Sequence, residues 1–359
     1  MSPETLAMLR ELCDAFGPAG YEDEVRAAMV RHLRPLAEIT YDRLGSVIAR
    51  KQGGSAEPRV MLPAHMDEVG LIVRQITPEG FLRFITVGGW WSQVMLGQRW
   101  IVRTHQGDLI AYTGPRAPHL LPEEERKKVV EPKDMVLDIG AKDEQEALAM
   151  GVRPGDPVAP AGSFAELGSG RLLAKAFDDR LGCAMVIEVL RQLAGSDHPN
   201  TVYAVGTTQE EAGLYGAQTS AFAIAPQVAI IAEVSVANDV PGSTRDGSYS
   251  ELGKGVAVCV RDAGLTPNRR LRELVVGVAE KEGIPVQYIT MERGTTDGTR
   301  IQVHGQGVPT LYIGPPARYI HSHAGIVDGE DFDNAVKLLV AVVRKLDRDT
   351  VAGLTRYDL

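Results

Sequence analysis

The chain has 359 residues, of which 44% are hydrophobic and 24% are charged. These proportions are typical of a globular protein and exclude a disordered, collagen-like or coiled-coil chain. With 38 basic and 47 acidic side chains, the net charge is −9, without the basic footprint of a nucleic-acid binder. No apolar run approaches the roughly 18 residues of a membrane span, and the N-terminus lacks the pattern of a secretory signal.

The cysteine content indicates the cellular compartment. Cys13, Cys183 and Cys259 form an odd set without CxxC spacing, which argues against a disulfide framework or a thiolate zinc site. We therefore expect a cytoplasmic protein that binds neither nucleic acid nor membranes.

The N-terminal part of the chain predicts two helices and a buried strand. Ser2 suits the cap of the first helix and Pro3 its first turn. Apolar residues at helical spacing predict a second helix over residues 22–36. The segment 59–64 (RVMLPA) predicts a buried strand, although Pro63 weakens its end.

Residues 70–165 differ from the rest of the chain in their sequence pattern. Short alternating runs punctuated by Gly and Pro are typical of all-β structure. We expect this region to be a separate β domain inserted into the domain that residues 1–69 and 166–359 form. The predicted strands of the insert include residues 81–87, 100–104 and 108–113.

Three tryptophans lie within this predicted insert. Trp90, Trp91 and Trp100 are expected to form part of its core, and a subunit contact is the alternative.

The second half of the chain has an α/β pattern. Strand-like segments alternate with apolar helical segments, which predicts a mostly parallel sheet flanked by helices on both faces. The predicted strands are residues 171–177, 201–208, 227–234 and 309–314, and the predicted helices are residues 179–193 and 332–346.

Polar residues cluster just beyond the predicted strands. In open α/β sheets, ligand sites collect at the carboxyl ends of the strands, so segments far apart in sequence are expected to converge. Nitrogen and oxygen donors without cysteine suit Zn, Co, Ni or Mn. The candidates are His65, Asp67, Asp178, Asp179, Glu210, Glu211, Glu233 and His321.

This residue set suits a two-metal site. Such a site needs ligands on each ion, one bridging group, and a carboxylate outside the ligand set to move the proton of a shared water. Each motif alone also has an ordinary interpretation: a helix cap for Asp178 and Asp179, a solvated face for Glu210 and Glu211, and a loop histidine for His321.

Two other functions are weighed against this one. In a glycosidase, paired carboxylates face each other across the sugar, roughly 5–9.5 Å apart. Consecutive residues at one strand end rarely do so, and His65 and His321 would have no role. A metal-stabilised binding or scaffold protein is the non-enzymatic alternative.

Ordered motifs along the chain resemble one known family. The chain is similar to the dinuclear metallo-aminopeptidases of the tetrahedral (TET) type, peptidase family M42. The motifs are AHMDEVG (64–70), PHLLPEEERKK (118–128), KAFDDRLGC (175–183), QEEAGLYGA (209–217) and RYIHS (318–322).

The resemblance implies a fold, an activity and an assembly. The fold would be that of zinc-dependent exopeptidases, and the activity would be removal of N-terminal residues from peptides. Each subunit would hold two divalent metal ions, with Zn first and Co or Mn as alternatives. The subunits would form a homo-oligomer, a dodecamer built from dimers. Residues 1–69 and 166–359 would be the catalytic domain, and the insert over residues 70–165 would serve dimerisation, assembly and access.

The resemblance also implies a role for each site residue. Asp178 would bridge the two metals, Asp67 would orient a ligand histidine, and Glu210 would act as base and acid on a metal-bridging water. A cis peptide between Asp178 and Asp179 is expected. His65 and Glu233 would bind the first metal, and Glu211 and His321 the second.

Three positions differ from the family pattern or have no settled role. Glu233 stands where many members have Asp, which bears on metal preference. His323 follows the RYIHS motif where Pro is common, and we expect it to be exposed, with a hydrogen-bond donor beside the ligands as the alternative. Asp297, within GTTDG (294–298), is expected to shape the substrate side of the pocket.

Overall fold

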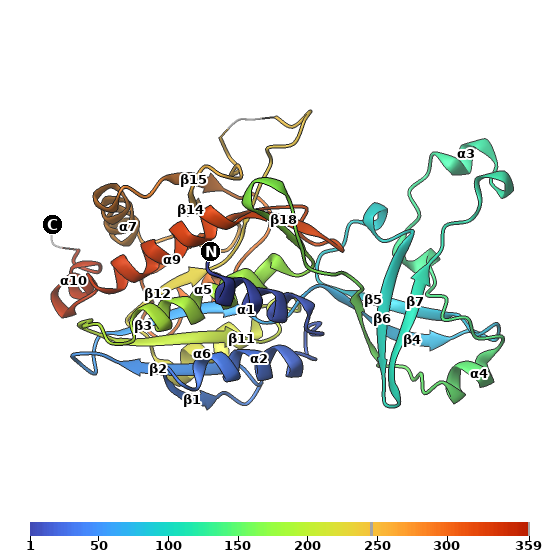
Figure 1. Cartoon of the computed structure of the whole chain (residues 1–359), viewed down its shortest axis with the longest axis horizontal. Helices are drawn as coiled ribbons and strands as arrows, with labels where there is room; N and C mark the ends of the chain where they lie inside the picture. The colour runs from blue at the N-terminus through green and yellow to red at the C-terminus, as the bar shows by residue number, and fades with distance from the viewer. Residues whose placement is uncertain (245–246, 358–359) are drawn as a thin grey trace.

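The computed structural model describes residues 1–244 and 247–357. A larger body is built around an eight-stranded mixed sheet, and a smaller body with its own sheet extends to one side (Figure 1). The large sheet has the order β1 (Glu38–Tyr41), β2 (Val47–Gln52), β11 (Thr201–Thr207), β3 (Arg59–His65), β12 (Val228–Ala232), β16 (Thr310–Gly314), β14 (Val256–Arg261) and β15 (Val286–Thr290).

The four central strands of this sheet, β11, β3, β12 and β16, run parallel to one another. Antiparallel pairing occurs only toward the flanks, at β1 with β2, β2 with β11, and β16 with β14, among the described strands. The expected α/β fold with a mostly parallel sheet is therefore confirmed.

Pro63 lies inside the central strand β3 rather than at an edge, where proline is normally confined. Its nitrogen has no hydrogen to donate to a neighbouring strand. The pairing of β3 with β12 ends at Met61 and Ala229, two residues before the proline. β12 therefore separates from β3 before His65, whereas β11 stays paired with β3 as far as Thr207 and His65.

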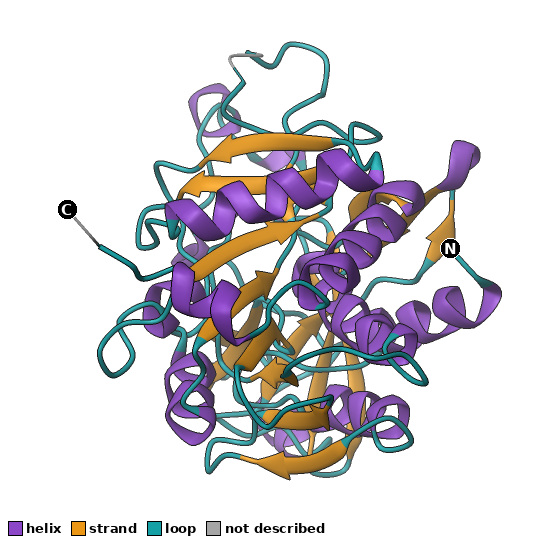
Figure 2. Cartoon of the chain, turned by 90° about the vertical axis from the view of Figure 1, so that its left-hand side faces the viewer, coloured by secondary structure: helices purple, strands orange, loops and turns teal. Residues whose placement is uncertain are grey.

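Helices cover both faces of the large sheet (Figure 2). Side chains alternate between two cores, because successive residues of a strand point to opposite faces: Leu62 of β3 belongs to the larger core and Met61 to the smaller. One face carries α1 (Pro3–Asp14), α2 (Asp23–Leu33), α5 (Phe177–Gln192), α7 (Arg269–Glu282) and α9 (Gly329–Val343), and the other carries α6 (Tyr215–Ile224) and α8 (Gly298–Ile301).

The predicted strand at residues 171–177 is shorter than expected and joins a different sheet. It spans Arg171–Ala174, because the chain turns at Ala176 to begin α5. This second sheet has the order β13 (Ser235–Val236), β17 (Pro316–Arg318), β18 (Gly325–Asp328), β10 (Arg171–Ala174) and β9 (Ala165–Glu166).

The smaller body confirms that the fold contains an inserted β region. It also contains two short helices, α3 (Glu123–Arg126) and α4 (Glu144–Ala149), so the expectation of an all-β domain is incomplete. Its sheet has the order β5 (Leu82–Val87), β4 (Gly70–Ile76), β8 (Pro157–Pro160), β6 (Gln98–Thr104) and β7 (Gly107–Thr113). We propose residues 70–165 as the bounds of this domain.

The three tryptophans of the insert differ in their environment. Trp100 is fully buried in the core of the insert, and Trp90 packs against that core. Trp91 is 62% exposed, so the expectation of a core position is wrong for this residue. Trp91 begins a turn of 3-10 helix at the surface, where its side chain has no inward direction.

Three elements near the C-terminal edge of the sheet were not anticipated from the sequence: β14, α7 and β15. The signal for α7 is present, because Asn268 caps it and Leu271, Val275 and Val278 recur at helical spacing. A last short helix, α10 (Arg348–Gly353), follows α9.

None of the helices within residues 1–244 and 247–357 is long and apolar enough to cross a membrane.

A buried ion cluster fixes the start of α5 to the N-terminal segment. Glu68 Oε1 lies 2.6 Å from Lys175 Nζ and 3.4 Å from Arg180 Nη2. The Arg180 guanidinium also donates to the carbonyls of Leu12 and Gly17, which lie in α1 and the turn beyond it. One carboxylate thus compensates two buried cations directly behind the candidate site.

We expect Glu68→Gln to lower the free energy of unfolding by about 3–5 kcal/mol, because it leaves two buried cations without their anion. Urea unfolding of the purified protein measures this change. The control is Glu166→Gln, which removes an exposed pair with Arg10 at 3.6 Å and is expected to cost less than about 1 kcal/mol. Equal costs for both variants would contradict the prediction.

Candidate metal centre

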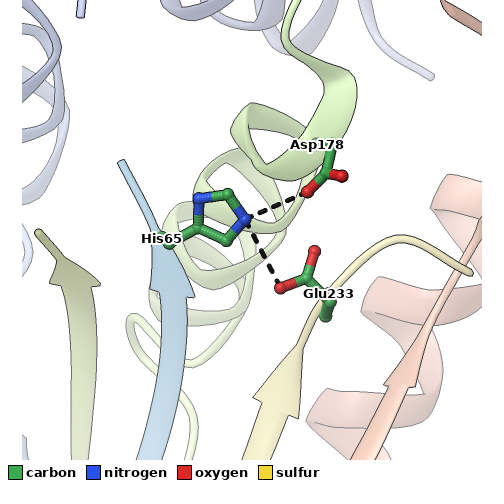
Figure 3. Close-up of side chains that lie close together, drawn as sticks. All are labelled: His65, Asp178 and Glu233. Atoms are coloured by element: carbon green, nitrogen blue, oxygen red, sulfur yellow. Dashed lines mark hydrogen bonds and ion pairs between the residues drawn. The ribbon is translucent and has the colours of Figure 1, made fainter. Parts of the chain in front are cut away.

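The candidate site lies at the carboxyl ends of the central strands. His65 is the last residue of β3, and Glu233 directly follows the last residue of β12. Asp178 comes from the opposite direction, at the start of α5, and points toward both of them (Figure 3). The convergence predicted from the strand ends is therefore present in the structure.

The first group of donors consists of His65, Asp178 and Glu233. His65 Nε2 lies 3.0 Å from Asp178 Oδ1 and 3.6 Å from Glu233 Oε2. Donors about 2.0–2.1 Å from one tetrahedral Zn²⁺ lie about 3.3 Å apart, and the two observed separations bracket that value.

The second group consists of Asp178, Glu211 and His321. His321 Nε2 lies 3.2 Å from Asp178 Oδ2 and 3.1 Å from Glu211 Oε1. The ligand atoms of each group lie within 4.8 Å of one another. Asp178 belongs to both groups and turns a different oxygen to each of them.

Both histidines are held by their second ring nitrogen. His65 Nδ1 lies 3.1 Å from the carbonyl oxygen of Asp67, and His321 Nδ1 lies 2.6 Å from the carbonyl oxygen of Gly89. A carbonyl oxygen only accepts, so each Nδ1 carries the proton and leaves Nε2 free as a ligand. Gly89 belongs to the insert, and sequence reasoning did not identify its contribution.

Asp67 supports more of the site than the sequence suggested. Its Oδ1 is 3.7 Å from His65 Nδ1, too far for a hydrogen bond, and that nitrogen is instead held by the Asp67 carbonyl oxygen at 3.1 Å. The same carboxylate accepts hydrogen bonds of 2.9 Å from the backbone N–H groups of Glu210 and Glu211. A single fully buried side chain therefore ties the β3 ligand to the loop after β11.

Asp179 was expected as part of a helix cap, and it also contacts the site. The peptide bond between Asp178 and Asp179 is cis, as the resemblance implied. Asp179 Oδ1 accepts from Gly182 N at 3.0 Å, and Oδ2 accepts from His65 N at 3.2 Å. The carboxylate of Asp179 thus points away from the donor groups and holds the backbone of a donor.

Left-handed backbone conformations surround the donor groups. Ala176, Gln209, Tyr319 and His321 have φ between 55° and 61°, a region that residues other than glycine seldom adopt. These four residues lie at or within two positions of Asp178, Glu210 or His321. Such strain persists only where the surroundings hold it, and it concentrates at functional sites.

The carboxylates of the site are poorly compensated by protein groups. Burial raises the pKa of Glu233 well above its usual range, and the charge of Asp179 raises it further. Burial likewise raises the pKa of Glu210, against the opposing charge of His65. Anionic oxygens held this close repel one another, and a divalent cation relieves that repulsion. The donor set therefore fits divalent metal ions.

The imidazoles respond to the same excess of negative charge. Burial disfavours a charged His321, yet hydrogen bonds with Asp178 and Glu211 raise its pKa to about 11. Burial also disfavours the charged form of Asp178, but the same hydrogen bonds and those with His65 hold its pKa well below the usual range. On each side of Asp178, a divalent cation that replaces these protons would find one histidine and one glutamate as donors.

A cavity of about 260 Å³ opens directly onto the donor groups. Beyond them its wall is formed by apolar side chains, by Arg293 and by residues 294–296. Asp297 does not line this cavity; its Oδ2 accepts from Thr207 Oγ1 at 2.5 Å behind the site. The expectation that Asp297 shapes the substrate side is therefore wrong, because the chain turns its side chain toward β11.

His323 is not exposed, contrary to expectation. Its ring packs edge-on against Trp100, with ring centroids 4.4 Å apart. Burial lowers its pKa to about 4. The RYIHS loop folds back over the insert, so a position that looks like a free loop residue in the sequence becomes a contact between the two bodies.

Comparisons with known proteins agree with this geometry. The profile of the M42 glutamyl aminopeptidase family matches residues 45–338. The lysyl aminopeptidase of Pyrococcus furiosus is 34% identical over 94% of this chain and 96% of its own.

Solved structures match over nearly their whole length. A TET aminopeptidase from the archaeon Thaumarchaeota archaeon SCGC AB-539-E09 superposes with a TM-score of 0.95 at 43% identity, covering 98% of this chain and 99% of its own. The TET1 peptidase of Pyrococcus horikoshii, which can assemble into a tetrahedron or a large octahedral shell, has a TM-score of 0.86 at 32% identity, covering 95% of this chain and 100% of its own.

We expect Asp67→Asn to weaken binding of divalent cations about 10–100-fold, because an amide cannot accept with both atoms from the backbone of Glu210 and Glu211. Calorimetric titration of the metal-free protein with Zn²⁺ measures this loss. Asp138→Asn is the control, because Asp138 makes a similar backbone contact, to Gly140, in the insert. Equal affinities for the Asp67 variant and the control would rule out the supporting role.

Proposed function

The chain belongs to the M42 glutamyl aminopeptidase family and is a peptidase hydrolase, and on this basis we propose that it is a dinuclear metal-dependent aminopeptidase. In this proposal His65 and Glu233 bind one ion, Glu211 and His321 bind the other, and Asp178 bridges them. Zn²⁺ is the first choice for both ions, with Co²⁺ or Mn²⁺ as alternatives.

The observation that carries the proposal is the position of the Asp178 carboxylate. Its two oxygens face two separate histidine and glutamate pairs, at 3.0 Å from His65 and 3.2 Å from His321. A single-metal site has no use for a second, equally complete set of donors. A carboxylate shared in this way is the bridging group that a two-metal hydrolase requires.

When bound, the two cations would supply Lewis-acid stabilisation of negative charge and would lower the pKa of the attacking water. Glu210 is assigned to proton transfer, because it lines the cavity but belongs to neither donor group. Its carboxylate takes a proton from the attacking water and delivers it to the leaving amide nitrogen. Asp67 holds the Glu210 backbone during both transfers.

The proposed substrates are peptides with a free N-terminus. The α-amine enters the acidic end of the cavity. There a carboxylate other than the bridging Asp178 pairs with it. The apolar wall formed by Val234, Val236 and Met291 faces the rest of the substrate.

The insert is proposed to build a homo-oligomer, a dodecamer assembled from dimers. A dodecamer is known for the related PhTET1. Ile85 and Ile110 on strands of the insert are 51% and 62% exposed, an apolar surface that a subunit contact would cover.

The three cysteines are buried and free, which supports the proposed cytoplasmic location.

We expect cleavage of aminoacyl-fluorophore substrates and short peptides to stop after chelation and to return with Zn²⁺, Co²⁺ or Mn²⁺. Fluorescence release and mass spectrometry of the products measure this. Peptides with an acetylated N-terminus are the control and should remain intact. No cleavage by protein that holds two ions would favour the scaffold alternative.

Substitution of the two adjacent glutamates separates their roles. Glu210→Gln is expected to keep both metal ions and to lower kcat at least about 100-fold, because it removes the proton carrier. Glu211→Gln is expected to lose one ion, because it removes a ligand. Metal analysis and steady-state kinetics on both variants test this, and full turnover by Glu210→Gln would exclude the assigned base.

A further inference from the structure

His321 adopts a conformation that its own backbone does not favour. Its φ is 55°, and that of Tyr319, two residues earlier, is 61°. A non-glycine residue in this region is strained, so contacts from elsewhere must hold it. The side chain is still partly exposed, at 32%, so burial alone does not hold it.

The insert makes two contacts with this loop, from two adjacent residues of its own to two loop residues that are separated by Ser322. The Gly89 carbonyl accepts the hydrogen bond from His321 Nδ1 at 2.6 Å. The next residue of the insert, Trp90, packs against His323, with ring centroids 5.8 Å apart. Two residues of the insert thus contact two residues of the loop.

The His323 ring packs against two aromatic side chains, and its polar neighbour is the backbone of Arg99. It lies edge-on to Trp100 at 4.4 Å, with an angle of 80° between the rings, and Trp90 and Trp100 are 5.1 Å apart. Neither ring nitrogen has a side-chain hydrogen-bond partner within the described chain. The ring therefore acts through its shape and its aromatic surface.

Backbone packing on the other side leaves His323 little freedom. A Cβ at Gly162, where the chain leaves the insert, would lie 2.9 Å from the His323 carbonyl oxygen. Trp90 is itself fixed by a hydrogen bond of 3.1 Å from its indole to the Gly70 carbonyl. Both ends of the insert therefore restrain His323: Gly162 directly, and Gly70 through Trp90.

We propose that His323 is a positioning residue for His321. Its ring, held between Trp90 and Trp100, fixes the strained loop so that His321 Nε2 stays 3.1–3.2 Å from Glu211 and Asp178. This proposal rests on the proposed two-metal site. It assigns the aromatic pocket of the insert to the second metal only, because no hydrogen bond or ion pair among the described residues joins His65 or Glu233 to this loop, and only Asp178 contacts both.

Titration of the metal-free variants with Zn²⁺, followed by calorimetry, tests the proposal. His321→Ala is the reference, since it abolishes the binding step of the second ion. We expect His323→Ala to weaken that same step about 10-fold or more and to leave the other step within about 3-fold. His323→Phe keeps the ring contacts, and we expect it to restore the second step to near the wild-type affinity.

The matched control is His304→Ala, which removes another histidine packed edge-on against an aromatic ring, that of Phe222, with centroids 6.3 Å apart. His304 lies in the turn after α8, outside the insert, and its substitution should alter neither step. Trp90→Leu disturbs the same contact as His323→Ala from the other side, so it should reproduce the selective loss even where the His323 variant folds poorly.

Two results overturn the positioning role: equal weakening of both binding steps, or a lowered melting temperature with both affinities unchanged. Failure of the underlying function has a different appearance. Wild-type protein that binds fewer than two ions overturns both proposals. Wild-type protein that binds two ions without cleaving peptides overturns the aminopeptidase alone.

Discussion

The concentration of buried negative charge at one end of the sheet is the constraint on which the rest of the site depends. Asp178, Glu210, Glu211 and Glu233 converge at one cavity, and His65 and His321 are the only basic groups of the described residues in ion-pair contact with them. Such a cluster is unfavourable without cations. The surrounding structure holds it by fixing the backbone and the ring nitrogens. Within residues 1–244 and 247–357, no Lys or Arg forms an ion pair with the metal-facing atoms.

Support for the cluster comes from every layer of the fold. Asp67 joins the end of β3 to the loop after β11, and Asp179 joins the start of α5 to β3. Behind them, the ion cluster of Glu68, Lys175 and Arg180 fixes α5 to the N-terminal segment. On this side both cations contact Glu68, and Arg180 is also hydrogen-bonded to backbone carbonyls, whereas at the cavity the carboxylates outnumber the imidazoles that contact them. This contrast distinguishes a structural ion cluster from a site built to take a metal.

Much of this arrangement was predictable from the sequence, and the reason is local. His65, Glu211 and Glu233 each follow an apolar strand, and parallel strands bring their carboxyl ends together whatever the loops do. The family of the chain was evident from motifs in the same places. These arguments identified the residues; their individual roles remain proposals.

The unpredicted features depend on contacts between distant segments. No pattern in the sequence relates Gly89 to His321, because their contact is a backbone carbonyl 232 residues away. The environment of His323 and the direction of Asp297 were misjudged for the same reason. In both cases the loop looked open, and its side chain was in fact turned inward by a packed neighbour.

The hydrogen bond from His321 to Gly89 has a consequence for the modularity of the chain. The insert has its own sheet and its own core, so it resembles a unit that recombination could exchange freely between relatives. Yet it carries a backbone atom that completes the metal centre of the larger body. An incoming insert would therefore have to match the outgoing one at residues 88–90 in backbone path, even if its outer surface were entirely different. Variation among relatives should accordingly be tolerated at the tip of the insert and restricted at its base.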